Sequence, residues 1–459
     1  MREKRQKQMP LMLANKSNFP QARELAAISD ILDKYPIIND LAYQDLCKFS
    51  SFKKNTGAEG MSAEQVVRAA IVKAMFGYAY RSLAFHISDS DCLRQFCLIG
   101  NFGKSFKKSA LQENIKALSA ETLEQINHII VGHAKDEKIE AGREIRVDCT
   151  VVESNIHHPT DSSLLFDVVR VLTRLLVKAR ESGVSGLHFQ KHNKRAKRRA
   201  MGILNARTKK DRCLHYKDLL KVTKKTVGYV RAALPVMESL DNVTSFQQFL
   251  DMLAIAGEMR HYLPLADKVI SQAERRVIFG ETVPAHEKIV SIFEEHTDII
   301  IKDRRETYFG HKICLTGGRS NLILDCQILD GNPPDSALTL PMLDRQKAIY
   351  GRYPLKAAFD GGFASKDNVT KAKAKERGVK DICFSKKRGI KVQDMCRSEY
   401  VYKRLRNFRA GIESGISWLK RSFGLGRCNW KGWESFKSYV WASVVSANLL
   451  TLARTNLAV

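Results

Sequence analysis

The chain has 459 residues, and its 76 Lys and Arg against 49 Asp and Glu leave a net charge of +27. With 44% hydrophobic and 27% charged residues, it is neither wholly disordered, nor collagen-like, nor a small disulfide-stapled domain. The length indicates about three domain-sized units. A surplus of roughly one positive charge per 17 residues favours a polyanionic partner, and nucleic acid is the commonest polyanion.

The ten cysteines indicate a reducing compartment. They are scattered and form no Cys-x-x-Cys pair, so we expect core thiols and neither a disulfide framework nor a zinc site. The apolar stretch at 11–14 is too short for a signal peptide, and polar residues interrupt the apolar stretch at 439–452 before it could span a membrane. We therefore expect a cytoplasmic protein without a membrane segment.

Residues 1–137 are expected to form a helical domain. Ser62-Ala63-Glu64-Gln65 has the pattern of a capping box, and apolar residues recur after it at helical spacing, with Arg68 and Lys73 outside the stripe. Such a bundle with basic outer faces suits either a DNA-binding module of the helix-turn-helix type or a dimerisation module, because no recognition helix can be selected. Further helices are expected at 22–34, 41–49, 80–97 and 119–133.

The pattern changes at 143–152, where apolar and polar residues alternate as in a β-strand. Asp148 lies in the middle of this run, although aspartate is depleted in strands. From 161 to 296 the pattern is helical again and strongly basic. Residues 191–225 hold 14 Lys and Arg against Asp211 and Asp218, a density that favours phosphate contact over a solvated helix face.

The remaining sequence predicts a mixed sheet with helices packed on it, an α/β (α+β) fold. Strands are expected at 298–302, 307–316, 322–329, 355–360 and 380–385. Helices are expected at 336–350, at 365–377 and from about 405 to 455, the last with a break at 424–433.

Two further sites carry acidic residues in suggestive positions. Asp360 ends a strand and precedes two glycines, so it could meet Asp148 at the sheet edge, although a lone Asp-Gly pair is also typical of a turn. Arg409, Glu413 and Lys420 lie on one side of a predicted helix, a spacing that a salt-bridged surface helix would share.

Taken together, these segments resemble the DDE transposases of bacterial insertion sequences, and are closest to the ISNCY group. The order is a strand Asp, a strand-end Asp and a helix Glu within Arg-x3-Glu-x6-Lys. The similar segments are 147–162, Phe309-Gly310-His311-Lys312, Gly331-Asn332-Pro333, 360–365 and 409–420, and residues 40–100 look like the helical N-terminal domain of related transposases.

The resemblance implies an RNase H-like catalytic domain formed by 138–160 and 297–459. It is preceded by the DNA-binding or dimerisation domain (1–137) and interrupted after its first strand by a basic helical insertion (161–296). Asp148, Asp360 and Glu413 would hold two Mg²⁺ ions, for which Mn²⁺ is expected to substitute, since Mg²⁺ prefers oxygen ligands. The enzyme would cut the element ends and join their 3′-hydroxyls to target DNA.

The partners implied are double-stranded DNA, both terminal inverted repeats and target, and further copies of the chain in a homodimer or higher oligomer, within the bacterial nucleoid. The expected phosphate contacts are Arg409, Lys420, Arg421, Lys194, Arg195, Lys197, Arg198 and Arg199. No nucleotide triphosphate is expected, because Gly103-Lys104-Ser105 lacks the first glycine of a phosphate-binding loop.

Two positions depart from the resemblance, and two other functions stay open. Arg406 stands where related families have Tyr, and Cys149 where a small hydroxylic residue is expected. The chain could instead be a structure-selective nuclease that cuts without joining, or an inactive DNA-binding relic. Other polar residues near the strands are expected to be caps, turns, edge positions or structural histidines: Glu153, Asp161, Asp325, Asp330, Asp335, His157, His158 and His311.

Overall fold

The computed structural model describes residues 3–5, 19–48, 60–100, 103–238, 245–302 and 306–458. They form two compact units, of which unit 1 comprises Met1–Asn155 and Gly310–Val459 and unit 2 comprises Ile156–Phe309. The stretch at 11–14, on which the prediction about a signal peptide rests, lies outside the described residues. The roles assigned to the four sequence segments stay predictions.

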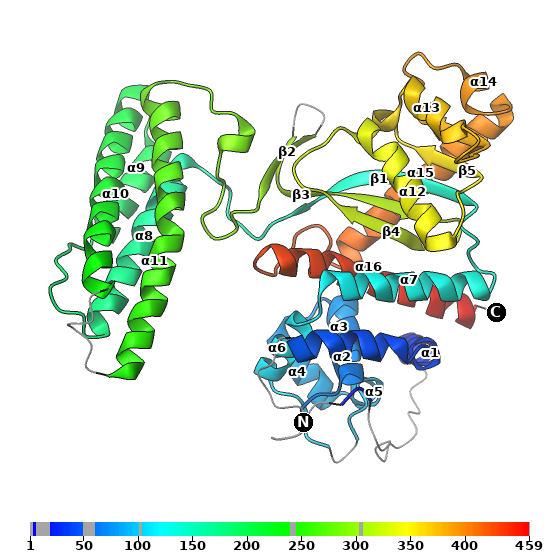
Figure 1. Cartoon of the computed structure of the whole chain (residues 1–459), viewed down its shortest axis with the longest axis horizontal. Coiled ribbons are helices and arrows are strands. Elements are labelled where there is room, and N and C mark those ends of the chain that lie inside the picture. Colours follow the sequence, from blue (N-terminus) through cyan, green and yellow to red (C-terminus); the bar gives the residue numbers. More distant parts are fainter. Residues whose placement is uncertain are drawn as a thin grey trace. The chain divides into compact units, whose positions relative to one another are not determined.

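The N-terminal part of unit 1 is helical, as predicted (Figure 1). The predicted helix at 80–97 is two helices because Ser90 caps the second, and the helix at 108–116 was not predicted. The capping box of Ser62 and Gln65 is confirmed by reciprocal bonds of 3.2 and 3.1 Å. The helices are α1 (Pro20–Lys34), α2 (Ile37–Lys48), α3 (Ala63–Phe76), α4 (Tyr80–Asp89), α5 (Asp91–Phe96), α6 (Lys108–Lys116) and α7 (Ala120–Asp136).

The prediction that Arg68 and Lys73 lie outside the buried stripe of α3 is wrong. Both are buried, because α3 packs against α2, α6 and the C-terminal helix and so has little exposed surface. Arg68 remains charged in the core by binding oxygens: its guanidinium lies 2.6 Å from Asp33 and 3.2 Å from the Phe96 carbonyl oxygen. It does not contribute to a basic outer face.

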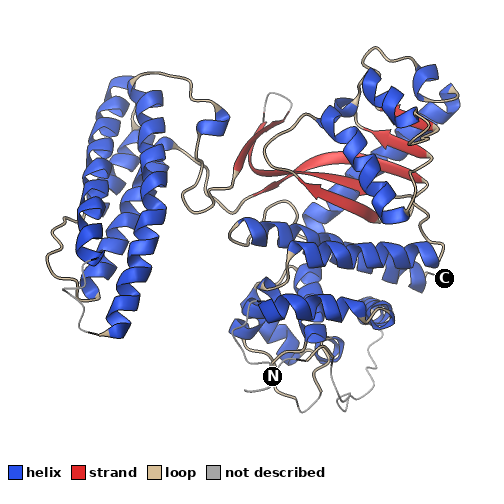
Figure 2. Ribbon diagram, viewed as in Figure 1, coloured by secondary structure: helices blue, strands red, loops and turns tan. Residues whose placement is uncertain are grey.

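The six-stranded sheet is mixed (Figure 2). Without β2 the order is β4-β3-β1-β5-β6, with β4, β3 and β1 antiparallel and β1, β5 and β6 parallel. This is the arrangement expected for an RNase H-like domain, and the predicted fold class is confirmed. The strands are β1 (Glu144–Glu153), β2 (Asp298–Lys302), β3 (Glu306–Gly317), β4 (Ile323–Ile328), β5 (Lys356–Phe359) and β6 (Asp381–Phe384).

Different helices cover the two faces of the sheet. Residues directly opposite each other on neighbouring strands share a face of the sheet. Asp325 is opposite Thr316, and Thr316 is opposite Val147, so all three share one face. Asp148 follows Val147 and therefore lies on the other face. Arg345 of α12 contacts the Asp325 face, and α15 contacts β1, β5 and β6 on the other. The helices are α12 (Thr339–Tyr350), α13 (Lys366–Lys373), α14 (Val392–Met395) and α15 (Glu399–Ser422).

The C-terminal helix α16 (Trp433–Leu457) is a core element of unit 1. It is buried along most of its length against α1, α3 and α7, which explains the apolar stretch in the sequence. Asn448 donates to the Asn127 carboxamide oxygen of α7 at 2.7 Å and accepts from the Ile323 amide of β4 at 2.9 Å, which ties the N-terminal helices to the sheet. No helix of the described residues is long and apolar enough to cross a membrane.

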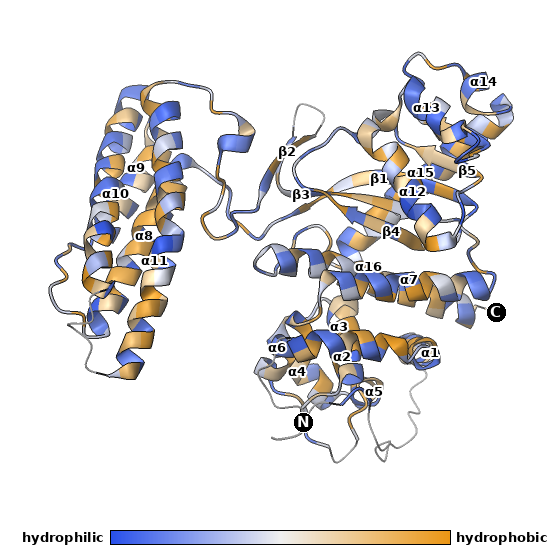
Figure 3. Ribbon diagram, viewed as in Figure 1, coloured by the Kyte–Doolittle hydropathy of each residue, from blue (hydrophilic) through white to orange (hydrophobic). Residues whose placement is uncertain are grey.

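Unit 2 is a bundle of four long helices with its own hydrophobic core, and apolar residues run along α8 and α11 in Figure 3. The basic run at 191–225 covers α9 and the first half of α10. A π-helical turn at Glu274–Ile278 ends the bundle. The four helices are α8 (Asp161–Glu181), α9 (Asn193–Asn205), α10 (Lys209–Glu238) and α11 (Phe246–Ala273).

Helix α15 approaches β1 closely because two glycines permit it. A Cβ atom at Gly411 would lie 1.8 Å from Nη1 of Arg146, and one at Gly317 would lie 2.8 Å from the Ile412 side chain. Arg146 is buried on β1, donates to the Phe408 carbonyl oxygen at 3.2 Å and to Asn321 at 2.7 Å, and lies over the Phe408 ring. The guanidinium is therefore fixed and cannot move aside without losing these bonds.

We expect Gly411→Ala to destabilise the protein by about 1–3 kcal/mol, because the new methyl group displaces Arg146 or lifts α15 from β1. Gly415→Ala is the matched control on the same helix: its Cβ would make an ordinary 3.9 Å contact with Ile323, so a gain of up to about 1 kcal/mol is expected from helix propensity. Urea denaturation of the two variants measures both. Equal stabilities would contradict the packing argument.

Candidate active site

The pairing of β1 with β5 brings Asp148 and Asp360 to the same level of the sheet. The parallel register pairs Val147 with Phe359, the last residue of β5. Asp148 follows Val147 along β1, and Asp360 directly follows the end of β5. Alternation along a strand places Asp148 on the face opposite to Val147, which is the face that α15 covers. The third carboxylate, Glu413, is in the middle of α15.

Arg409 contacts all three carboxylates. Its Nη2 atom lies 3.3 Å from Oδ2 of Asp148 and 2.5 Å from Oε1 of Glu413, and its Nη1 atom lies 3.4 Å from Oδ1 of Asp360. The guanidinium is 13% exposed, whereas Glu413 is 60% exposed, so the cluster is open to solvent on the side of the helix. Three acidic residues from three separate elements therefore meet at one point.

Hydrogen bonds keep Asp360 ionised. Burial alone would raise the pKa of its carboxyl group, but the Ser385 hydroxyl, which donates to Oδ1 at 2.7 Å, the Gly361 and Gly362 amides and the Arg409 charge together lower the pKa below its ordinary value. The Cys149 amide likewise donates to Asp148 at 2.8 Å. The Asp360 carboxylate is thus able to bind a cation at neutral pH.

The other predicted residues of α15 lie farther along the helix. Lys420 and Arg421 are in its last turn, about two turns beyond Glu413, and Arg421 is exposed. Arg406, which replaces the expected Tyr, is exposed one turn before Arg409. Cys149 lies opposite Cys314 on the sheet face away from Asp148, and all ten cysteines are free. Arg406 and Cys149 therefore lie outside the carboxylate cluster.

A second acidic cluster, formed by Glu124, His128 and Asp325, brings three ligand atoms within 4.8 Å of one another. Arg345 already occupies it, donating to both oxygens of Asp325 at 2.5 and 2.6 Å and to Glu124 at 2.6 Å. Asp325 is fully buried. Burial alone would raise the pKa of its carboxyl group, but hydrogen bonds from His128 and Arg345 lower that pKa below its ordinary value. This cluster is an ion pair that joins α7, β4 and α12.

The three histidines near the strands have structural partners. His157 lies 3.5 Å from Asp167, His158 packs against Phe309, and His311 packs between Trp433 and Phe436. Their interpretation as structural residues stays a prediction. Among the acidic residues, Asp161 pairs with Arg276 and Asp335 with Lys312.

The basic residues of unit 2 divide into paired and unpaired groups. Arg195 and Arg199 both bind Asp218. Their hydrogen bonds, of which that from Arg195 has the larger effect, lower the pKa of the Asp218 carboxyl to about 2 in spite of its partial burial. Lys194, Lys197 and Arg198 are exposed, and no ion pair with another described residue is seen for them. Of these five residues, Lys194, Lys197 and Arg198 can contact a phosphate without breaking an ion pair.

The basic run at 191–225 includes the lysines of α10, but the sequence did not indicate which of them share a face. Lys217, Lys221, Lys224 and Lys225 lie on one face of the helix and line an open hollow of about 560 Å³ together with Glu274 of the π-helical turn. Their spacing of four, three and one residues would have identified this face once a helix was assumed.

Residues 283–449 match the family described as the transposase DDE domain. The matched range contains Asp360, Arg409 and Glu413 and begins after Asp148. No curated protein and no solved structure matches the chain. The narrower ISNCY group is not tested by the family match and stays a prediction. The chain therefore carries a transposase DDE domain over residues 283–449.

Proposed function

We propose that this transposase cuts DNA at the ends of an insertion sequence by metal-dependent phosphodiester hydrolysis and joins the 3′-hydroxyl ends to target DNA by transesterification. The observation that carries the proposal is the convergence of Asp148, Asp360 and Glu413 on one guanidinium group. Three carboxylates on three elements, partly open to solvent, are what a site for divalent cations and a DNA phosphate requires.

The donor set fits Mg²⁺ or Mn²⁺, because it consists of oxygens and the Asp360 carboxyl has a lowered pKa. Two such ions, when bound, activate a water or a 3′-hydroxyl and stabilise the leaving oxygen. Asp148, Asp360 and Glu413 would together hold these ions. The Ser385 hydroxyl donates to Oδ1 of Asp360, the same oxygen that lies near Arg409, and so helps to fix the position of this carboxylate.

Double-stranded DNA is the proposed partner, with the unpaired cations of unit 2 and Lys420 and Arg421 of α15 as phosphate contacts. Joining requires two element ends at once, so a homodimer or higher oligomer is the proposed active form. A structure-selective nuclease would use the same carboxylates without pairing ends. Retention of all three carboxylates supports an active enzyme over a DNA-binding relic.

Replacing Asp148 by Asn should reduce cleavage of labelled end DNA by at least about a hundredfold, because loss of a metal ligand removes several kcal/mol of transition-state stabilisation. DNA binding should persist. Asp344→Asn is the control, since that carboxylate is paired with Arg377 away from the cluster. The assay contains Mg²⁺, end DNA and a target plasmid, and its products are separated on denaturing gels.

The products also distinguish the two enzymatic functions. Joined product with wild-type protein supports the transposase, whereas cleavage without any joining would favour the nuclease. Undiminished cleavage by Asp148→Asn would show that the site is elsewhere.

Arg409→Gln should bind Mn²⁺ roughly tenfold more tightly than the wild type in the absence of DNA, a difference of about 1.4 kcal/mol, because a divalent ion must otherwise compete with the guanidinium. Calorimetry and the electron paramagnetic resonance signal of free Mn²⁺ measure the affinity. Arg404→Gln is the control on the same helix, since Arg404 pairs with Glu144. Equal Mn²⁺ affinity of Arg409→Gln and wild type would contradict the competition.

The combined variant Lys194→Ala, Lys197→Ala and Arg198→Ala should reduce the salt dependence of DNA binding by up to about 2.7 units of log–log slope, about 0.9 for each lost phosphate contact. Arg195→Ala with Arg199→Ala should change the slope less, because Asp218 already balances part of their charge. Fluorescence anisotropy across a KCl series measures both slopes. An unchanged slope in the triple variant would make these residues a solvated surface.

A further inference from the structure

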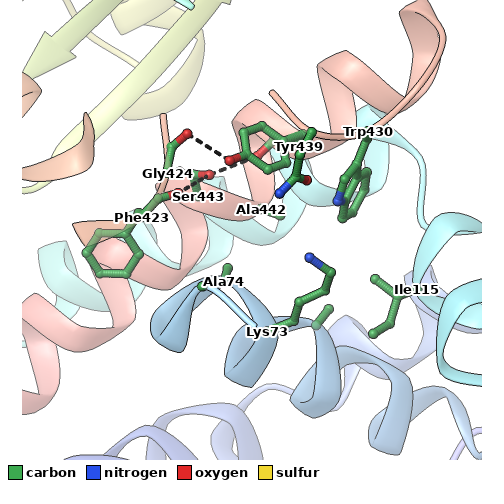
Figure 4. Close-up of a pocket in the computed structure, with 12 residues that line it drawn as sticks. Lys73, Ala74, Ile115, Phe423, Gly424, Trp430, Tyr439, Ala442 and Ser443 are labelled. Atoms are coloured by element: carbon green, nitrogen blue, oxygen red, sulfur yellow. Dashed lines mark hydrogen bonds between the residues drawn. The ribbon is translucent and has the colours of Figure 1, made fainter. Parts of the chain in front are cut away.

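A cavity of about 110 Å³ lies within unit 1, between α3, α6 and the C-terminal helix α16 (Figure 4). Its wall includes Lys73 of α3, Trp430 from the segment before α16, and Tyr439 and Ser443 of α16. The volume is several times that needed for one water molecule, so an anion of several heavy atoms fits. None of the three candidate catalytic carboxylates lines it, and the inference does not depend on the proposed function.

Lys73 is a buried cation whose charge has no acidic partner. Only 8% of the residue is exposed, and no ion pair or hydrogen bond joins its ammonium group to another described residue. The nitrogen lies 4.9 Å from the centre of the Tyr80 ring and 5.5 Å from that of Trp430. Aromatic faces attract a cation more weakly than a carboxylate does, so they offset only part of the cost of burial.

The other buried cations in the described part of the chain are satisfied by oxygen atoms. Arg68 binds Asp33, Arg146 binds Asn321 and the Phe408 carbonyl, and Lys312 binds Asp335 and the Pro333 carbonyl. Lys73 departs from this pattern. Burial lowers its pKa to about 8, and the nearby Cys428 thiol offsets the shift only in part, so the amine is still mostly charged at neutral pH.

A second donor in the same cavity also lacks an acceptor. The indole N–H of Trp430 is buried and has no hydrogen-bond partner. Figure 4 shows the Lys73 side chain pointing from α3 toward the space beside the Trp430 ring. The hydroxyls of Tyr439 and Ser443 are already used, since they donate to the carbonyl oxygens of Gly424 and Phe423. The cavity therefore presents one positive charge and one free N–H donor.

We propose that this cavity is a binding site for a small oxyanion of phosphate size, with Lys73 as its charge partner and the Trp430 indole as a second hydrogen-bond donor. A phosphate oxygen would accept from both groups and neutralise the buried charge. The phosphate could be free in solution or could be the terminal phosphate of a DNA strand, and both sources share this chemistry. Occupation would strengthen the packing of α3 against α16.

The test is a thermal-shift and calorimetric titration of the full chain with inorganic phosphate at constant ionic strength, adjusted with chloride. We expect a saturable rise in melting temperature for the wild type. Lys73→Met should abolish it, and should be at least as stable as the wild type without phosphate because it removes an unpaired buried charge. Lys437→Met is the matched control: Lys437 lies over the Trp433 ring but is paired with Glu434, so the phosphate response should persist.

Trp430→Phe keeps the ring and removes the N–H, and it should weaken phosphate binding roughly tenfold. A wild type without a saturable response, or an equal response in Lys73→Met, would overturn the proposal. If Lys73→Met does not fold, unchanged affinity in Trp430→Phe overturns it instead. Competition by a 5′-phosphorylated trinucleotide, but not by its unphosphorylated form, would identify a DNA end as the source, and competition by neither would identify free phosphate.

Discussion

The contact between Arg409 and three carboxylates is the interaction around which the candidate active site is organised. Asp148, Asp360 and Glu413 come from β1, from the end of β5 and from α15, and their negative charges would repel one another without a cation among them. A guanidinium can satisfy several carboxylates at once because it presents five donors in one plane. Under the proposed function, Arg409 would contact a DNA phosphate when divalent ions bind the carboxylates, so the observed contact is compatible with the role that the family resemblance implies.

That cluster depends on how closely α15 lies to β1. Gly411 and Gly317 leave room for Arg146 and Ile412, and Arg146 bonds the helix backbone at Phe408, one residue before Arg409. The helix is therefore held at the level of Asp148 by the strand that carries Asp148. On the other face, Arg345 holds Asp325 and Glu124, and this ties the N-terminal helices to the same sheet. The helical N-terminal segment and the sheet accordingly form a single unit.

Sequence patterns predicted the strands and the long helices, because these depend on local periodicity, and the family resemblance indicated the three acidic positions. Asp148 was conspicuous as an aspartate in a β-rich run, and the register of β1 with β5 accounts for its place beside Asp360. The position of a cation within a fold was not predictable in this way. Arg68 was expected on the surface and is buried, and Arg195 was expected to contact a phosphate and binds Asp218. Both outcomes depend on residues distant in sequence.

The cations of the chain thus occupy different situations, of which three matter most here. On unit 2, Lys194, Lys197 and Arg198 are exposed and unpaired with described residues, which is the condition for releasing counterions on binding DNA. In the core of unit 1, Arg68, Arg146 and Lys312 bind oxygens and serve the fold. Lys73 belongs to neither group. It is buried, as Arg68, Arg146 and Lys312 are, but it has no oxygen partner among the described residues. Since an unpaired buried charge is costly, a fold that retains one is best explained by a partner from outside the chain.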